Sequence, residues 1–204
     1  MATFEVDTVR FTSEILGRSW DLNVYLPPDY VGSGLEYPVL YLLHGSGGDE
    51  TSWCTGIEVL DALISAGKIL PTIAVAPRAS HWWVDTVEPF ERAFMGDLIP
   101  FIDRTYRTIP SRGGKAVAGL SMGGYGALRY ALTYPGRFAA AILLSPALYN
   151  VLPPPDSSAR TTGAFGTPFD PALWSLLNYP EMLKSYAKKG FEVPIFIAAG
   201  DDEW

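Results

Sequence analysis

Short apolar runs bounded by proline or glycine dominate the pattern of hydrophobic and polar positions along the chain. Most of the runs are continuous rather than alternating, which is typical of strands covered on both faces of a sheet. The runs that predict strands are residues 22–26, 39–43, 73–76, 116–120, 139–144 and 193–199. Their number and spacing indicate one extended sheet.

Helical spacing of apolar residues separates several of these runs. One apolar face lies at positions 57–64 and ends at Gly67, a residue suited to a left-handed helix cap. A second apolar face spans residues 90–102, and Pro100 is expected to kink that helix. Strands that alternate with helices predict an α/β fold with a mostly parallel central sheet and helices on both faces.

The two ends of the predicted sheet differ from its centre. Residues 4–11 and 20–26 flank a turn at 16–18, which predicts an antiparallel pair on the N-terminal edge. Residues 152–168 are rich in Pro, Ser, Thr and Gly, so they form either a linker or an excursion over the domain surface. We favour the excursion, because the run at 193–199 suits the same sheet.

The length and the charge of the chain bear on its number of domains and on its possible partners. The chain has 204 residues, 22 acidic and 15 basic side chains and a formal charge of −7. This length predicts a single domain over residues 1–204. The sequence pI of about 4.8 argues against nucleic acid as a partner, because affinity for phosphates rests on Lys and Arg.

We also expect no membrane partner and a cytoplasmic location. The apolar stretches are shorter than the ~20 residues that cross a bilayer, and the N-terminus lacks a basic flank followed by an apolar run. Cys54 is the single cysteine and cannot form an internal disulfide, which fits a reducing compartment. It has no second Cys or His at metal-ligand spacing, and we expect no metal and no cofactor.

The strongest local motif is Gly119-Leu120-Ser121-Met122-Gly123. It follows a predicted buried strand and opens a helical segment, which is the setting of a nucleophile elbow. Glycines two residues either side of a serine relieve collisions in a sharp turn. We therefore predict Ser121 as a nucleophile, with the Met122 N–H as one donor to an oxyanion.

A second motif lies after the predicted strand 39–43. His44-Gly45-Ser46-Gly47-Gly48 is a glycine-rich turn whose backbone can point towards a neighbouring strand end, and the Ser46 N–H is the second predicted oxyanion donor. We expect His44 to orient this loop through hydrogen bonds to the backbone rather than to act as a base.

Together these residues carry a resemblance to a known family. The segments 37–53, 95–109 and 116–148 resemble the esterase-D-like branch of the α/β-hydrolase superfamily, which includes S-formylglutathione hydrolases, tributyrin-type esterases and feruloyl esterases. The similarity extends over residues 4–204, and the block around Ser121 is its most specific part. The resemblance implies an α/β-hydrolase fold, a nucleophilic Ser121, and a substrate cleft bordered by Trp53, His81 and Trp82.

An acidic turn follows the last predicted strand. The family usually places its acid three residues after a glycine equivalent to Gly200, which is Glu203 here, and Asp202 is adjacent. Either carboxylate is a candidate to orient a histidine base. The clustered carboxylates also fit a solvated turn.

The histidine expected after the acid is missing from the sequence, because His44 and His81 both precede Ser121. Three interpretations remain. The chain is a C-terminally incomplete esterase that lacks the last helix, the last strand and the base; His81 has taken over as base; or the chain is a non-catalytic relative that acts as a binding module.

The function predicted from the sequence is hydrolysis of a small-molecule carboxylic ester through an acyl-serine intermediate. The alternative chemistry is acyl transfer, because an alcohol or sugar can intercept the same intermediate.

Overall fold

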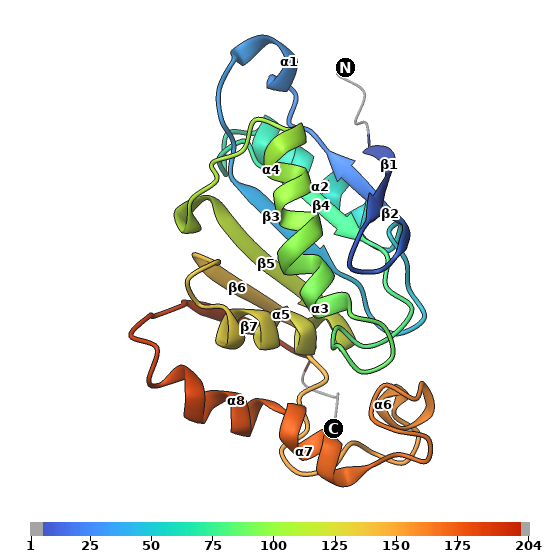
Figure 1. The fold of residues 1–204 in the computed structure, drawn as a ribbon. Coiled ribbons are helices and arrows are strands. Elements are labelled where there is room, and N and C mark those ends of the chain that lie inside the picture. Colours follow the sequence, from blue (N-terminus) through green and yellow to red (C-terminus); the bar gives the residue numbers. More distant parts are fainter. Residues whose placement is uncertain (1–5, 201–204) are drawn as a thin grey trace.

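The structure, a computed structural model, describes residues 6–200 and is built on a seven-stranded sheet (Figure 1). The strands are β1 (Val6–Ser13), β2 (Arg18–Tyr25), β3 (Val39–Leu43), β4 (Ile73–Pro77), β5 (Lys115–Leu120), β6 (Ala140–Leu144) and β7 (Ile195–Ala198). Their order in the sheet is β1-β2-β4-β3-β5-β6-β7. Strands β3 to β7 are parallel, whereas β2 pairs antiparallel with β1 and β4. The predicted parallel sheet with an antiparallel N-terminal edge is confirmed.

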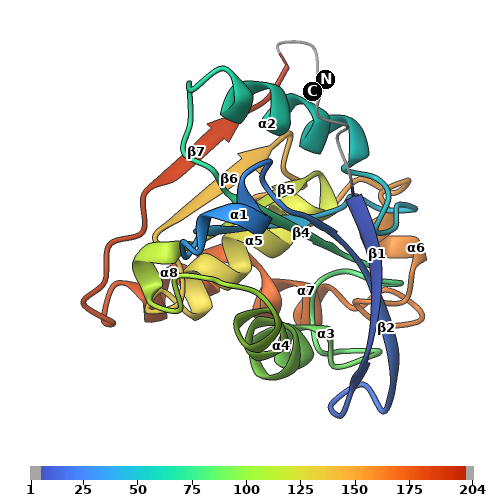
Figure 2. The ribbon, with the colours of Figure 1, turned by 90° about the horizontal axis from the view of Figure 1, so that it is seen from above.

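Helices cover both faces of this sheet. They are α1 (Tyr30–Ser33), α2 (Cys54–Ser65), α3 (Phe90–Ala93), the π-helical η1 (Phe94–Leu98), α4 (Ile99–Thr105), the 3₁₀-helical η2 (Arg112–Gly114), α5 (Met122–Thr133), α6 (Ser158–Thr161), α7 (Pro171–Leu177) and α8 (Tyr179–Tyr186). Seen from above, α2 lies on one side of the sheet and α4 and α5 lie on the other (Figure 2). Within residues 6–200, no helix combines the length and apolar character needed to cross a membrane.

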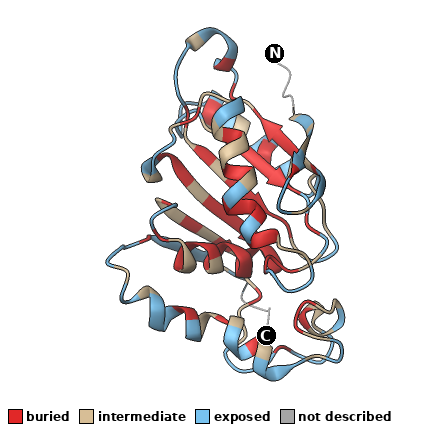
Figure 3. Ribbon diagram, in the orientation of Figure 1, coloured by how far each residue is buried: buried red, intermediate tan, exposed pale blue. Residues whose placement is uncertain are grey.

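Alternation along each strand divides the interior into two apolar clusters. Tyr41 and Val117 point to the face covered by α4 and α5 and belong to the larger cluster. Leu42 and Ala118 point the other way and pack with Ile57 of α2. The central strands and the face of α5 are buried, while the outer turns of α8 are exposed (Figure 3). The cluster on the face covered by α4 and α5 is the larger of the two and contains most of the buried apolar residues.

The N-terminal hairpin has the predicted antiparallel pairing. Val6 lies opposite Tyr25 and Ser13 lies opposite Arg18. Gly17 closes the turn at a φ of 65°, a conformation that glycine adopts without strain. Phe4, which begins the predicted first strand, lies outside the described residues.

The two helices predicted from apolar spacing are present. Helix α2 ends at Ser65, and Gly67 follows in the left-handed region with a φ of 65°. In the second helix the distortion expected at Pro100 takes the form of a π-helical turn. The Ile99 N–H donates to the Phe94 carbonyl five residues back, and Pro100, which has no N–H, comes next.

Residues 145–194 form an excursion between β6 and β7 that contains α6, α7 and α8. Strand β7 pairs parallel with β6 in the same sheet, so the interpretation as an excursion rather than a linker is confirmed. The Trp174 indole donates to the Val151 carbonyl at 2.9 Å, and the Asn178 amide donates to the Tyr149 carbonyl at 2.8 Å. These two bonds join α7 and the residue after it to the first part of the excursion.

A buried ion pair between α3 and α5 holds the arginine that binds the excursion. Arg129 Nε of α5 donates to Glu91 Oε2 of α3 at 2.5 Å, and the two side chains are 13% and 4% exposed. Arg129 Nη1 and the Tyr125 hydroxyl both donate to the Leu177 carbonyl at the end of α7, at 3.1 and 2.6 Å. Burial raises the pKa of Glu91 against the opposing effect of Arg129.

We expect Glu91→Gln to lower the free energy of unfolding by about 3 kcal/mol, because the buried Arg129 charge loses its counter-ion. Denaturant unfolding measures the change. Arg92→Gln is the matched control, since Arg92 pairs with Asp85 at the surface and an exposed pair contributes little. Equal effects of the two substitutions would show that the Glu91–Arg129 pair does not hold the fold.

Candidate active site

Ser121 occupies the turn between β5 and α5, as the motif predicts. Its φ and ψ are 55° and −117°, a region that residues with a side chain rarely adopt. Such a conformation costs about 1–3 kcal/mol and persists only where the surroundings impose it. The geometry is that of a nucleophile elbow.

The flanking glycines are required by direct backbone contact. A Cβ added at Gly119 would lie 2.0 Å from the Gly123 carbonyl oxygen. A Cβ at Gly123 would lie 2.0 Å from the Leu43 carbonyl oxygen at the end of β3. Strand β5, helix α5 and strand β3 therefore approach more closely than any side chain allows.

The end of β6 also fastens the elbow, which the sequence pattern did not indicate. The Ser121 N–H donates to the Leu144 carbonyl at 3.0 Å, and the Ala147 N–H donates to the Ser121 carbonyl at 3.0 Å. A Cβ at Gly124 would lie 2.7 Å from Pro146 Cβ, so this loop also abuts α5. The one available signal was a proline two residues after the end of a strand.

The glycine-rich loop after β3 faces Ser121. A Cβ built on Gly45 would lie 3.4 Å from Ser121 Cβ and 4.0 Å from its Oγ. Ser46 is exposed, and Met122 stands in the first turn of α5, where a backbone N–H has no intrahelical acceptor. Both residues thus flank the elbow, and their role as oxyanion donors stays a prediction.

His44 is fully engaged in holding this loop. The Ala79 N–H donates to Nε2 at 3.0 Å, so Nε2 is an acceptor and the proton sits on Nδ1, which donates to the Gly45 carbonyl at 2.7 Å. Burial lowers the pKa of the ring. Both nitrogens of a neutral imidazole are occupied, as expected for a residue that orients the loop.

The predicted aromatic border of the cleft does not form one wall. Trp82 is fully buried on the α5 side of the sheet, where its ring meets those of Tyr125, Phe165 and Trp174 at centroid distances of 5.1–5.9 Å. Trp53 packs against the cluster on the α2 face and lines a groove of about 340 Å³ with Leu42 and Ala118. The two tryptophans belong to opposite faces of the sheet.

His81 lies in the loop that follows β4. Its Nδ1 is 3.0 Å from Ser80 Oγ and 3.8 Å from Glu88 Oε2, and its side chain is 25% exposed. Within residues 6–200 no hydrogen bond joins Ser121 Oγ to either imidazole. Among the described residues, the hydrogen-bond partner of His81 is Ser80 and not Ser121.

Both acid candidates, Asp202 and Glu203, lie outside the described residues. The strand that leads to them lies next to β6, since the Ser145 N–H donates to the Ala198 carbonyl at 2.7 Å. The end of β7 thus adjoins the end of β6, next to the elbow in the order of the sheet.

We expect His44 to give the stability a pH dependence. Because the folded state keeps the ring neutral, stability is present above the ordinary histidine pKa and falls as the pH drops below it, by at most about 1.4 kcal/mol per pH unit. In urea unfolding between pH 5.5 and 7.5, the stability advantage of the wild type over His44→Gln should shrink as the pH falls. A constant difference would mean that the folded state binds the proton as readily as the unfolded chain.

The sequence is similar to those of known proteins, and the match extends over most of the chain. The Esterase family model matches residues 13–203. Esterase Rv1288 of Mycobacterium tuberculosis is 43% identical over 143 residues, which are 65% of this chain and 30% of that protein. An endo-1,4-beta-xylanase/feruloyl esterase of Xylanibacter ruminicola is 38% identical over 158 residues, which are 71% of this chain and 22% of that protein.

Among solved structures, a ferulic acid esterase matches with a TM-score of 0.79 and 26% identity, covering 98% of this chain and 81% of its own. The chain spans less than a third of the length of the two curated relatives. The family model nevertheless covers almost the whole sequence, and the sheet order and the elbow agree with it. The chain belongs to the Esterase family and has the α/β-hydrolase fold.

Proposed function

We propose that this chain hydrolyses small carboxylic esters through an acyl intermediate on Ser121. The observation that carries the proposal is the strained turn of Ser121 at the head of α5, with Gly45 of the loop after β3 facing it. Membership of the Esterase family supports the reaction class.

The chemistry follows from the position of each group. Ser121 Oγ bonds to the ester carbonyl carbon, and the carbonyl oxygen takes the negative charge. The N–H groups of Ser46 and Met122 donate to that oxygen, which is worth several kcal/mol where donors are fixed in advance. The C–O bond to the alcohol then breaks, the alcohol leaves with a proton, and water hydrolyses the acyl-serine.

The attack also needs an acceptor for the Ser121 proton. His44 is committed to the loop, and no histidine follows Ser121 in the sequence. Glu203 or Asp202 would orient an imidazole, as the carboxylate of a triad does. In the 204-residue chain we therefore propose that transfer of this proton limits the rate, so that an external base accelerates the reaction.

We propose a reducing compartment, the cytoplasm, because the sequence has a single thiol. Cys54 opens α2 and lies 3.9 Å from the Asn23 amide nitrogen, and the sequence holds no second cysteine to pair with it. The partner that we propose for the chain is its small-molecule ester substrate.

The proposal predicts release of p-nitrophenol from p-nitrophenyl acetate, butyrate and octanoate. Wild type should release the product faster than Ser121→Ala at every concentration of ester. Added imidazole should raise the rate of the wild type beyond its effect on Ser121→Ala, because only the wild type has a hydroxyl to deprotonate.

Absorbance at the nitrophenolate band measures each rate, and Ser65→Ala on the exposed end of α2 is the matched control. Equal rates for wild type and Ser121→Ala, with and without imidazole, would contradict the proposed function.

A further inference from the structure

Trp20 of β2 is a fully buried tryptophan whose polar atom binds the loop after β4. Its Nε1 donates to the Arg78 carbonyl at 2.6 Å. The Arg78 N–H in turn donates to the Asp21 carbonyl at 3.0 Å, so the first residue of the loop is bonded to β2 through both of its backbone groups. The rings of Phe11 and Phe90 lie 5.9 and 5.8 Å from the Trp20 ring, centroid to centroid, and hold the indole in this orientation.

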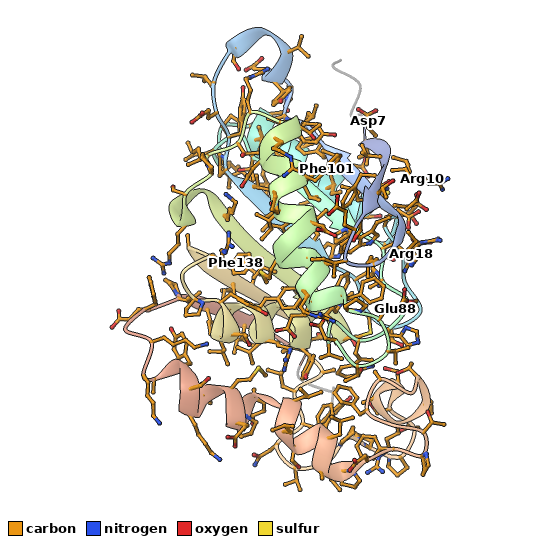
Figure 4. The ribbon with its side chains drawn as sticks, viewed as in Figure 1. Asp7, Arg10, Arg18, Glu88, Phe101 and Phe138 are labelled. Carbon is orange, nitrogen blue, oxygen red and sulfur yellow. The ribbon has the colours of Figure 1, made fainter. Side chains whose placement is uncertain are left out.

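A second contact joins β2 to the same loop. Arg18 donates from Nε and Nη2 to Glu88 Oε1 at 2.9 and 2.7 Å. Figure 4 shows the two residues on one flank of the molecule, beside the N-terminal hairpin. Arg18 precedes Trp20 by two residues and therefore lies on the same face of β2. The loop after β4 is thus attached to β2 both at its start and near its end.

The bond from Trp20 continues through one peptide group to the imidazole of His44. The Arg78 carbonyl and the Ala79 N–H belong to the same peptide group. Among residues 6–200 the cis bond is the one before Pro168, so this group is trans and its C=O and N–H point in opposite directions. The Ala79 N–H donates to His44 Nε2 at 3.0 Å. Trp20 and His44 therefore bind one peptide group from opposite sides.

The same pattern repeats on the other side of the ring. His44 Nδ1 donates to the Gly45 carbonyl at 2.7 Å, and the Gly48 N–H donates to the same oxygen at 3.1 Å. A Cβ on Gly48 would lie 3.0 Å from His44 Nδ1, so the turn closes this tightly because Gly48 has no side chain. Both lone pairs of the Gly45 oxygen are occupied, and the N–H of the same peptide group, which is that of Ser46, points away from the imidazole.

All donors in this chain of hydrogen bonds face in one direction. In order, they are Trp20 Nε1, the Ala79 N–H, His44 Nδ1 and the Ser46 N–H. The last of these has no acceptor within residues 6–200. It belongs to the peptide group of Gly45, where a Cβ would lie 3.4 Å from Ser121 Cβ. Hydrogen bonds in series polarise one another, by about 10–30% per bond. The chain therefore ends on a strengthened donor next to the elbow.

We propose that Trp20 is a positioning residue of the oxyanion site, which sets the direction of the Ser46 N–H and strengthens it as a donor through this chain. The effect belongs to the transition state, because the oxyanion exists only after Ser121 has attacked the ester. Binding of the uncharged ester is left unchanged. The inference rests on the proposed hydrolysis at Ser121.

The first test follows the chain by NMR and needs no activity. The variants are Trp20→Phe and, to keep the shape of the buried ring, a protein with 3-benzothienylalanine at position 20, which has no N–H. In both, the proton on His44 Nδ1 and the Ser46 amide proton should move upfield, as expected for weaker polarisation. Trp174→Phe is the matched control, because Trp174 is also fully buried and donates to a backbone carbonyl, that of Val151, at 2.9 Å.

The control should leave both resonances at their wild-type positions. Unshifted His44 and Ser46 protons in the variant with 3-benzothienylalanine would overturn the proposal. So would an Nε2–H tautomer of His44 in the wild type, since the chain of donors would then be interrupted at the ring.

The second test measures kcat and KM for p-nitrophenyl butyrate with imidazole present. Loss of a whole oxyanion donor costs about 10²–10³ in kcat, so a change of about 10–30% in the contribution of one donor corresponds to a fall of about 2- to 8-fold. We expect this fall in kcat for both changes at Trp20, with KM at the wild-type value. Trp174→Phe should keep both constants.

A raised KM with an unchanged kcat, or wild-type constants in the variant with 3-benzothienylalanine, would overturn the role of Trp20. The failure of the proposed function has a different signature. Wild-type rates no higher than those of Ser121→Ala, together with the expected NMR shifts, would overturn the proposed hydrolysis and leave the chain from Trp20 to Ser46 standing.

Discussion

The contact of backbone with backbone at the junction of β5, α5 and β3 is the constraint on which the site depends. The 2.0 Å gaps that a Cβ would meet at Gly119 and Gly123 mean that the strand, the turn and the helix have one way to fit. That fit holds Ser121 at a φ of 55° and directs the first turn of α5 at the space above it. The strain of about 1–3 kcal/mol is offset by the two buried clusters that grip β3 and β5 from either side. Loss of this contact would release the serine into an ordinary turn.

The loops around the elbow are held by side chains whose polar atoms are already in use. His44 bridges Gly45 and Ala79, so its ring ties the loop after β3 to the loop after β4. Trp83 adds a third link, because its indole donates to the His44 carbonyl at 3.2 Å. On the other side, Tyr125 and Arg129 of α5 hold the end of α7. The helix that follows Ser121, α5, therefore also anchors the excursion.

Local sequence patterns were sufficient to predict the strands, the hairpin and the elbow, because each depends on neighbours within a few residues. The orienting role of His44 was also predicted from its turn alone.

The placement of Trp53 and Trp82 on two different faces of the sheet was not predicted, because the sequence does not show on which face a loop packs. Pairs distant in sequence were missed for the same reason: Arg18 with Glu88 and Glu91 with Arg129 meet only after the sheet and α5 are in place. The π-helical turn before Pro100 was expected as a kink, since a missing N–H predicts distortion but not its form.

The central claim is that the elbow makes Ser121 a nucleophile, and covalent labelling tests it most directly. A fluorophosphonate probe followed by intact-mass and peptide mass spectrometry reports both the number of adducts and their position. We predict one adduct per chain, on the peptide that contains Ser121, formed faster in the presence of imidazole and absent from Ser121→Ala. A folded chain that remains unlabelled with imidazole present, or that is labelled on another serine, would contradict the account.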